Sequence, residues 1–333
     1  MKSLEQRKLS LYLIMGVSRP SFDSLPLQKD GPQGNAWGLY GQYDELGMLN
    51  LLSPETTIAA AKEIVHGVRV STDWPLDRMK VPAFSRQGFE QKLHHKAPRA
   101  VNDDILTFNT QSSSQWDGFR HFGYQKHKLF FNNRRQEEFQ NSTINGIHVW
   151  VENGGIIGRG VLLDYQSWAE SQGMTTNDFA LTTHSISLAD LHAVADLQNV
   201  SFQPGDILFV RSGYVKAFNS LSEVEAQKLV AAPNPPAIGL ESSEEILRWI
   251  WDNKFAAVAG DHPSFEAWPC QDTEHFLHEW LLAGWGVPIG ELFDLEPLAV
   301  ECRKLKKWSF FFSSMPLKVP GGVASPPNGV AIL

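Results

Sequence analysis

The chain has 333 residues, of which 42% are hydrophobic and 20% charged, an ordinary composition for a globular protein with a sizeable core. The formal net charge is -8 at pH 7, and no basic stripe of the kind that phosphate backbones require is present, so we expect no nucleic-acid partner. Two cysteines, Cys270 and Cys302, are too few for a disulfide framework or a cysteine metal site. A small-molecule partner and a reducing, cytoplasmic location are therefore expected.

The beginning of the chain predicts neither a membrane span nor a cleaved leader. The apolar stretch Leu9–Val17 is too short to cross a bilayer and is not followed by a small-residue cleavage site. Residues 18–50 are rich in proline and glycine, which is typical of an irregular segment that wraps around a body. We therefore divide the chain into an N-terminal lead-in, residues 1–50, and a single catalytic domain, residues 51–333.

Helical and strand patterns alternate along the remainder of the chain. Residues 56–66 are alanine-rich and helix-like, whereas residues 68–72 and 160–165 have the β-branched, apolar composition of strands. A capping box at Ser187 opens a helix, and a Pro-Gly-Asp turn leads into the apolar run Ile207–Val210. This alternation predicts a mixed α/β fold.

Three more elements complete this pattern. Residues 242–245 open a further helix, residues 256–260 form a strand that ends at Asp261, and residues 274–283 are predicted to be helical. On that last helix His275 and His278 share one side. No internal repeat, heptad or low-complexity tract is present.

Two polar clusters carry residue types that can bind a metal ion. In the first, residues 111–121, Asp117 and His121 offer an oxygen and an imidazole donor close enough to converge from one turn. The alternative is a surface loop with a capping aspartate and an isolated histidine. In the second, His275 and His278 can share a ligand, or simply form a polar helix face.

Glu291 lies among apolar residues that resemble a strand. A carboxylate there is costly unless it faces a cation or a partner, so we regard it as a candidate site residue. The chain has no GxSxG elbow, Walker loop, HExxH motif or GxGxxG after a strand. Serine hydrolases, kinases and dinucleotide enzymes are therefore not supported.

Taken in order, these segments resemble the cyclase family of metal-dependent hydrolases, which includes bacterial kynurenine formamidase and isatin hydrolase. The sequence is most similar to a fungal-type branch with a Gln-Trp-Asp-Gly-x-x-His motif. The resemblance extends over most of the chain and rests on Trp37-Gly38, residues 44–50, residues 205–213 and Glu291. It implies a swivelling β/β/α fold, in which flanking helices surround a partly closed β-barrel, and a homo-oligomer such as a dimer or tetramer.

The metal motif of this family, HxGTHxDxPxH, is altered in this chain. Its first histidine falls on Gln111, its threonine on Ser114 and its second histidine on Gln115. Its aspartate falls on Asp117 and its last histidine on His121. Two imidazoles are thus replaced by amides, which bind metal ions weakly, so the resemblance implies one divalent ion, Mn²⁺ or Zn²⁺, instead of two.

The resemblance also assigns roles to individual residues. The family places a later histidine and glutamate about twelve residues apart, and His278 and Glu291 match them with a one-residue insertion near residues 284–286. The implied ligands are Asp117, His278, Glu291 and Gln115. Asp117 and His121 are the implied catalytic residues, His121 as the proton shuttle. The residues expected beside the ion or the substrate are Gln111, Trp116, Arg120, Asp261, His262 and His275, with Arg120 or Arg211 orienting a substrate carboxylate.

The function implied is hydrolysis of a C–N amide, a cyclic amide or a lactone of a small molecule by metal-activated water. A second hypothesis keeps the ion but changes the reaction to cyclisation, dehydration or isomerisation of a specialised metabolite. A third, based on Gln111 and Gln115, is a metal-free relative that binds a ligand without turnover.

Overall fold

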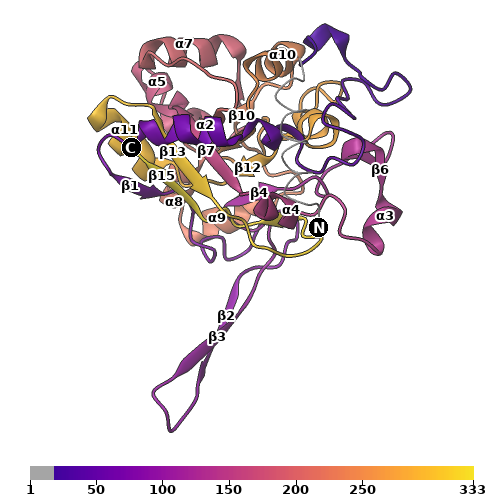
Figure 1. The fold of residues 1–333 in the computed structure, drawn as a ribbon. Helices are drawn as coiled ribbons and strands as arrows, with labels where there is room; N and C mark the ends of the chain where they lie inside the picture. The colour runs from indigo at the N-terminus through magenta and orange to yellow at the C-terminus, as the bar shows by residue number, and fades with distance from the viewer. Residues whose placement is uncertain (1–18) are drawn as a thin grey trace.

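A nine-stranded sheet forms the centre of the computed structural model, which describes residues 19–333 (Figure 1). The four central strands run parallel, and those toward the two ends pair antiparallel, so that the sheet curls into a partly closed barrel. The strand order is β1-β15-β13-β7-β9-β11-β12-β4-β14. The strands are β1 (Arg69–Ser71), β4 (Gln115–Asp117), β7 (Ile156–Leu163), β9 (Ile207–Val210), β11 (Ala257–Gly260), β12 (Ile289–Glu291), β13 (Ser309–Ser314), β14 (Ala324–Ser325) and β15 (Gly329–Ile332).

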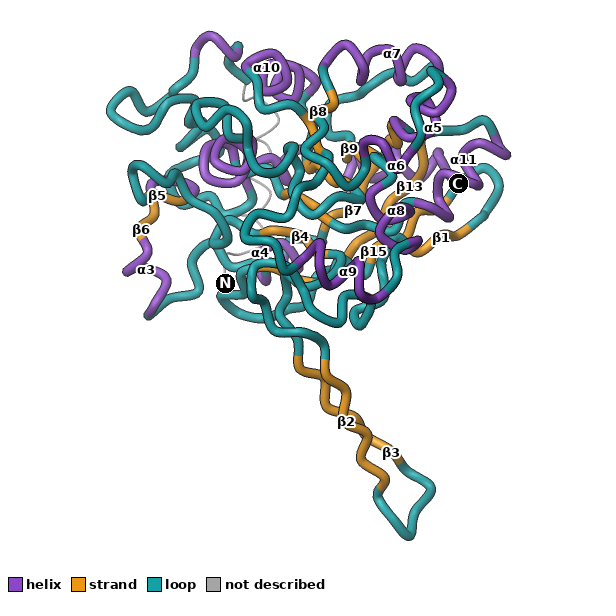
Figure 2. Tube along the Cα trace, turned by 180° about the vertical axis from the view of Figure 1, so that it is seen from behind, coloured by secondary structure: helices purple, strands orange, loops and turns teal. Residues whose placement is uncertain are grey.

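Helices flank the sheet, with α5, α7 and α10 on one side and α8 and α9 on the other (Figures 1 and 2). The α-helices are α2 (Pro54–Ala60), α3 (Gln136–Gln140), α4 (His148–Glu152), α5 (Tyr165–Ser171), α6 (Thr176–Phe179), α7 (Leu188–Gln198), α8 (Tyr214–Ser220), α9 (Glu223–Val230), α10 (Glu244–Asn253) and α11 (Glu296–Leu305). Short 3₁₀ turns are η1 (Phe22–Ser24), η2 (Gly47–Leu51), η3 (Ala61–Glu63) and η4 (Phe131–Asn133), and η5 (Glu279–Trp285) is a π-helix.

Small two-stranded ladders complete the β structure. β8 (Ser185–Ile186) pairs with β10 (Gly239–Leu240), and β5 (Leu129–Phe130) pairs with β6 (Arg134–Arg135). β2 (Glu90–His95) and β3 (Asn102–Thr107) form a long hairpin that projects away from the body (Figure 2). The predicted mixed α/β fold with a partly closed barrel and flanking helices is confirmed.

Most predicted elements lie where the sequence patterns place them. Ser187 caps α7 through a complete capping box, since its side chain accepts from the Asp190 N–H while Asp190 bonds back to its backbone. The predicted strand at residues 160–165 is shifted: β7 ends at Leu163, and Asp164 caps α5. The predicted helix at residues 56–66 ends in η3 at Glu63.

The prediction of a helix over residues 274–283 is wrong for the first residues of that range. Helical structure begins only at residue 277 and continues as the π-helix η5. The Asp272 carboxylate bonds to the Glu274 N–H and, at 2.7 Å, to the His275 ring, which holds the preceding residues in a turn. His275 and His278 therefore do not share a helix face.

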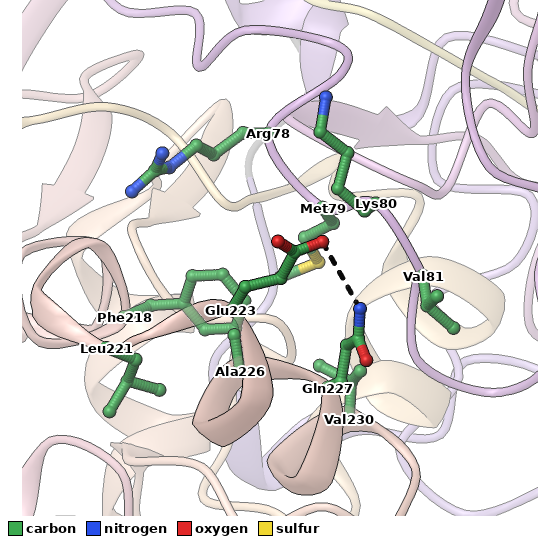
Figure 3. A pocket seen from close by; sticks show the side chains of 10 residues that line it. All are labelled: Arg78, Met79, Lys80, Val81, Phe218, Leu221, Glu223, Ala226, Gln227 and Val230. Carbon is green, nitrogen blue, oxygen red and sulfur yellow. Dashed lines mark hydrogen bonds between the residues drawn. The ribbon is translucent and has the colours of Figure 1, made fainter.

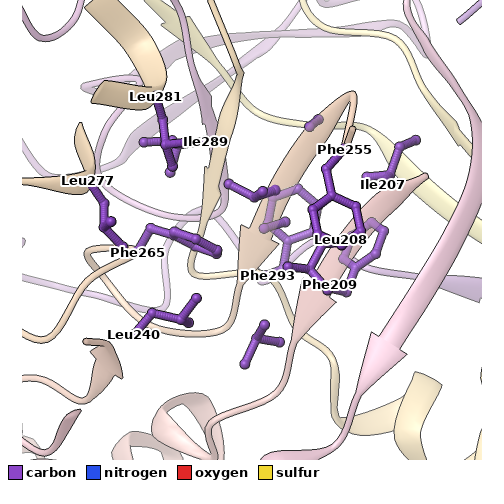
Figure 4. Close-up of a cluster of buried hydrophobic side chains, with 14 of the residues drawn as sticks. Ile207, Leu208, Phe209, Leu240, Phe255, Phe265, Leu277, Leu281, Ile289 and Phe293 are labelled. Carbon is purple, nitrogen blue, oxygen red and sulfur yellow. The ribbon is translucent and has the colours of Figure 1, made fainter. Parts of the chain in front are cut away.

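The core lies between the central strands and the segment that leads to the π-helix. Ile207, Leu208 and Phe209 of β9 contribute side chains to it, together with Phe265 and Phe293 from other parts of the chain (Figure 4). β9 and β11 are buried along their whole length. Continuous apolar runs of this kind are what parallel strands covered on both faces require.

The segment from residue 19 to residue 50 is irregular but contributes to this core. Trp37 is buried and donates from Nε1 to the Ala283 carbonyl at 2.6 Å, and the Met48 N–H bonds to the Gly286 carbonyl at 2.8 Å.

The division into residues 1–50 and residues 51–333 stays a prediction. The apolar stretch Leu9–Val17 lies outside the described residues. Among residues 19–333, no helix has both the length and the apolar content needed to cross a membrane.

Arg211 lies in a buried ion network and not in a substrate site. Its guanidinium contacts Asp164 at 2.5 Å and bonds to both oxygens of Glu296 at 2.8 and 2.7 Å. Asp164 also contacts Arg303 at 2.7 Å and caps α5. These contacts join α5, the end of β9 and α11, and they direct the Arg211 guanidinium to Asp164 and Glu296.

We expect Asp164→Ala to lower the free energy of unfolding by about 3–5 kcal/mol, because it leaves the buried Arg211 charge with one partner fewer. The matched control is Glu301→Ala, which removes the surface pair with Lys304 and should cost below about 1 kcal/mol. Urea denaturation followed by circular dichroism measures both. Equal losses in the two variants would contradict this account of the network.

Candidate metal centre

Strand pairing brings the two polar clusters of the sequence together. β4 pairs antiparallel with β12, with Gln115 opposite Glu291 and Asp117 opposite Ile289. Because side chains alternate along a strand, Gln115 and Asp117 point to one face of β4 and Trp116 to the other. Glu291 thus lies beside residues that precede it by more than 170 positions.

Three potential ligand atoms converge on the buried side of β4. Asp117 Oδ2 lies 3.7 Å from His121 Nε2 and 3.7 Å from His278 Nε2. Ligand atoms of these three residues all lie within 4.8 Å of one another. Asp117 is fully buried, and its Oδ2 atom has no hydrogen-bond partner. An orphaned buried carboxylate oxygen between two imidazoles is the arrangement that a divalent ion satisfies.

Carboxylates contact both ring nitrogens of His278. Glu266 Oε1 lies 2.7 Å from Nδ1, and Glu291 Oε1 lies 3.1 Å from Nε2. Glu266 is fully buried and helps to fix the orientation of the ring. A carboxylate on the far nitrogen of a metal-binding histidine is the usual way to orient such a ligand and raise its basicity.

The two glutamines occupy the remaining carboxylate oxygens. Gln115 donates from Nε2 to Glu291 Oε2 at 2.5 Å, and Gln111 donates from Nε2 to Asp117 Oδ1. Gln115 Oε1 is buried without a partner. The amides thus bond to Asp117 Oδ1 and Glu291 Oε2 and not to Asp117 Oδ2.

The electrostatics of the cluster follow from burial and close charges. Burial alone would raise the pKa of Asp117, but the imidazoles of His121 and His278 hold it below its ordinary value. Burial lowers the pKa of His121. For His278 the effect of burial is outweighed by Glu266, Asp117 and Glu291, which raise its pKa well above the usual range. Burial, followed by the Asp117 charge, raises the pKa of Glu291 to about 7.

The donors of this cluster fit Mn²⁺ or Zn²⁺. One carboxylate oxygen and two imidazole nitrogens are ligands that both ions accept, and three protein ligands are typical of a site that keeps a position for water. Glu291 lies beside this set without being part of it. Asp117, His121 and His278 would therefore hold the ion, with Glu291 next to it.

Three of the residues expected near the ion or substrate point elsewhere. Trp116 donates to Ser314 Oγ at 2.9 Å and packs against Phe293 in the core. Arg120 donates to three backbone carbonyls, of Ser142, Ile144 and Gly321. His275 bonds to Asp272 and stacks on Trp280.

Asp261 and His262 are buried near the end of β11. Asp261 accepts bonds from the Ser212 N–H, the Ser212 hydroxyl and the Gly213 N–H, which holds the entry to α8, and burial raises its pKa to about 6. Neither ring nitrogen of His262 has a partner, and burial lowers its pKa to about 3, so the ring is neutral.

Sequence reasoning missed two residues of the site, Glu266 and Arg86. Glu266 follows Asp261 by five residues, but nothing local indicates that it reaches His278. Arg86 donates to the Gln111 carbonyl at 2.9 Å, and its positive charge lowers the pKa of both His121 and Glu291. The positive charge of the Arg86 guanidinium therefore acts on His121 and Glu291.

Aromatic side chains line the side of the cluster next to His278. The rings of Phe122 and Phe276 lie 5.4 and 6.0 Å from the His278 ring, centroid to centroid.

A separate surface groove of about 190 Å³ lies between residues 78–81 and helices α8 and α9 (Figure 3). None of the cluster residues lines this groove, so it is not part of the candidate centre.

The π-helix lies between His278 and Glu291. A π-helix accommodates one extra residue within a helical turn, and η5 covers the place where the resemblance implies an insertion. Leu292, directly after Glu291, has φ of +52°, an uncommon conformation for a branched residue that often marks a functional site.

The partly closed barrel with flanking helices has the architecture of a cyclase, and the Asp, His and His side chains inside it form a candidate metal site. The family model for the cyclases matches residues 52–267, and the chain belongs to this family. The matched range includes Asp117 and His121 and ends before His278 and Glu291. The expected family resemblance is therefore confirmed.

Solved structures agree with this family. A crystal structure described as a novel cyclase is 29% identical, with a TM-score of 0.78 over 90% of this chain and 100% of that chain. Isatin hydrolase A from Labrenzia aggregata, bound to benzyl benzoate, is 13% identical, with a TM-score of 0.57 over 84% of this chain and 98% of its own. Isatin hydrolase A from Ralstonia solanacearum is 14% identical, with a TM-score of 0.56 over 84% and 97%. No curated protein matches the chain.

We expect His278→Ala to lose most of the bound ion and His275→Ala to retain it, because the His278 ring reaches Asp117 whereas the His275 ring bonds to Asp272. The measurement is metal per chain by elemental analysis after purification in Mn²⁺ or Zn²⁺. His278→Gln, which keeps a polar group opposite Glu266, serves as a second variant if the alanine form does not fold. Equal retention in folded His275 and His278 variants would argue against the cluster.

Glu266→Gln should weaken ion binding by about 10–100-fold, the usual effect of removing the partner of a metal-binding histidine. Titration of metal-stripped protein with Zn²⁺ gives the affinity. The control is Asp272→Asn, which changes the same kind of contact at His275. An unchanged affinity in Glu266→Gln would show that Glu266 does not position His278 for the ion.

Proposed function

We propose that the protein is a metal-dependent hydrolase that opens a C–N amide, a cyclic amide or a lactone of a small molecule, using one Mn²⁺ or Zn²⁺ ion. The observation that carries this proposal is the buried Asp117 Oδ2 atom, which has no partner and lies 3.7 Å from two imidazole nitrogens. Hydrolases named for isatin, itself a cyclic amide, share the fold.

The site geometry supports exchanging the roles that the sequence suggested for His121 and Glu291. His121 belongs to the three-residue set with Asp117 and His278, whereas Glu291 does not. We assign His121 as a ligand and Glu291 as the group that accepts the proton from the attacking water. Gln115 holds Glu291 Oε2, and this leaves Oε1 directed to the His278 side of the cluster.

When bound, the ion lowers the pKa of its water and polarises the substrate carbonyl. Asp117, His121 and His278 would hold the ion, and Glu291 would take a proton from the attacking water. The oxygen adds to the carbonyl carbon, the C–N or C–O bond breaks, and Glu291 returns the proton to the leaving nitrogen or oxygen. Water is consumed and no oxidant is required.

The glutamines support one ion in place of two. Gln111 donates to Asp117 Oδ1 and Gln115 donates to Glu291 Oε2, so both of these oxygens have a hydrogen-bond partner. An amide N–H in that position satisfies the carboxylates without a metal. These donors therefore replace a second cation by hydrogen bonds.

Arg86 is the residue we assign to the substrate or product carboxylate. Hydrolysis of a cyclic amide or lactone releases a carboxylate, and a guanidinium is a suitable partner for it. Arg120 and Arg211, which the sequence suggested, are fully engaged elsewhere. The Arg86 charge reaches His121 and Glu291, as their pKa values indicate.

The experiment that tests this function combines metal analysis with a substrate panel. We expect one ion per chain after metal-supplemented purification, and water addition to a member of a panel of isatin, N-formylkynurenine and simple lactones. A product without added water would favour cyclisation, dehydration or isomerisation. Two ions per chain would contradict the role of the glutamines, and protein that stays metal-free would favour a ligand-binding relative.

The exchanged roles predict opposite outcomes for two variants. His121→Ala should lose the ion, as Asp117→Asn should, because each removes one of three ligands. Glu291→Gln should retain most of the ion and lose turnover by about 10²–10⁴-fold, the usual value of general acid–base catalysis. Metal content and kcat are measured side by side. Ion loss in Glu291→Gln with retention in His121→Ala would restore the original assignment.

A further inference from the structure

Gln115 carries a buried acceptor that the fold leaves without a donor. Its side chain is completely buried, and among residues 19–333 no N–H or O–H group bonds to its Oε1 atom. A buried polar atom usually has a partner, and leaving one unpaired costs stability. An unpaired oxygen beside a candidate active centre therefore indicates a ligand that supplies the missing donor.

The orientation of the Gln115 amide is fixed by its own nitrogen. Nε2 donates to Glu291 Oε2 at 2.5 Å and to Gln111 Oε1 at 3.3 Å, so both of its hydrogens are engaged. Turning the amide over would place Oε1 against the Glu291 carboxylate, oxygen against oxygen. Gln111 is held in turn, because its Nε2 donates to Asp117 Oδ1. These bonds leave Gln115 Oε1 as an acceptor that the network itself does not use.

This oxygen lies next to the group that handles the proton in the proposed mechanism. It is bonded to the same carbon as Nε2, so it lies within about 5 Å of Glu291 Oε2. The other Glu291 oxygen, Oε1, lies 3.1 Å from His278 Nε2. Because side chains alternate along β4, Gln115 also shares one face of the strand with Asp117. In that mechanism Gln115 Oε1 is close to the leaving atom of the substrate when this atom takes up its proton.

The donor that fits this position is the N–H of a scissile amide. Asp117, His121 and His278 already offer the three ligands that a catalytic ion takes from a protein, and a neutral amide oxygen is a weaker ligand than these. When the C–N bond of a secondary amide breaks, its electron pair goes to nitrogen, which takes the Glu291 proton and keeps its own hydrogen. That hydrogen becomes more positive as the proton arrives, so an acceptor that faces it stabilises the leaving group. The ring oxygen of a lactone has no hydrogen and would meet Gln115 Oε1 with lone pairs.

We propose that Gln115 determines specificity: its Oε1 atom accepts the N–H of the scissile amide, so that the site favours lactams and secondary amides over lactones of the same shape. This assignment rests on the hydrolase function proposed above and narrows its substrate class. Gln115 is then a residue that reads the leaving group, in addition to holding Glu291.

The test uses two ring compounds that differ in one group. Isoindolinone is a lactam, and phthalide is the lactone with oxygen in place of the N–H, so the exchange adds no bulk. The variant is Gln115→Met, which keeps the length of the side chain and removes the carbonyl oxygen. The matched control is Gln111→Met, which removes a neighbouring amide whose oxygen already has a donor.

Calorimetry on the full-length protein, loaded with Mn²⁺ or Zn²⁺, gives the affinity for each compound, and kcat/KM is compared in the same way if they are hydrolysed. The preference for the lactam in wild type and in Gln111→Met should exceed that in Gln115→Met by about 10–100-fold, the usual effect of leaving one buried polar group unpaired. Comparing ratios cancels the intrinsic difference between the two carbonyls and any general loss of activity. Equal ratios in wild type and folded Gln115→Met would overturn the proposal.

A crystal structure of the metal-loaded wild type soaked in acetamide tests the contact without a variant or turnover. The acetamide nitrogen should lie about 3 Å from Gln115 Oε1. An ion bonded to Oε1, or an Oε1 that takes no acetamide N–H, would overturn the assignment. If neither ring compound binds or reacts, the hydrolase function loses its support, and the acetamide structure still decides the role of Gln115.

Discussion

The burial of three carboxylates around one imidazole is the constraint on which the candidate centre depends. Asp117, Glu266 and Glu291 are all removed from water, and His278 contacts or approaches each of them. Charges buried at this cost persist only where positive charge and hydrogen bonds compensate them. The negative charge of these carboxylates is compensated by the His278 ring and by the amide donors of Gln111 and Gln115. A divalent ion would add positive charge at the same place.

The curled sheet makes that concentration of charge possible. Its parallel strands β9 and β11 are wholly apolar and form a rigid, dry interior, while β4 and β12 close the sheet antiparallel at its far side. The polar face of β4 therefore meets β12 inside the protein instead of at its surface. A site built on strands of this kind is held more accurately than one built on loops.

The hairpin of β2 and β3 joins this rigid centre to an element that projects from the body. It leaves the body between Arg86 and Gln111, and Arg86 donates to the Gln111 carbonyl at 2.9 Å. The segment that carries Arg86 is itself anchored on the body, since Ala83 is buried and Phe84 packs against Trp268. The root of the hairpin and the border of the cluster therefore belong to one stretch of chain.

The sequence alone determined the mixed α/β class, the buried strands and the capped helices, because apolar runs and capping boxes are local patterns. It also identified Asp117, His121, His278 and Glu291 as candidates from their residue types and surroundings, and the family resemblance then assigned their roles. Only the tertiary structure decided which side chains meet. Trp116 and Arg120 are neighbours of the ligands in sequence but point away, because side chains alternate along a strand and turn with the loop after it. Glu266 reaches His278 and Arg86 reaches the cluster through contacts across the fold, which no local pattern encodes.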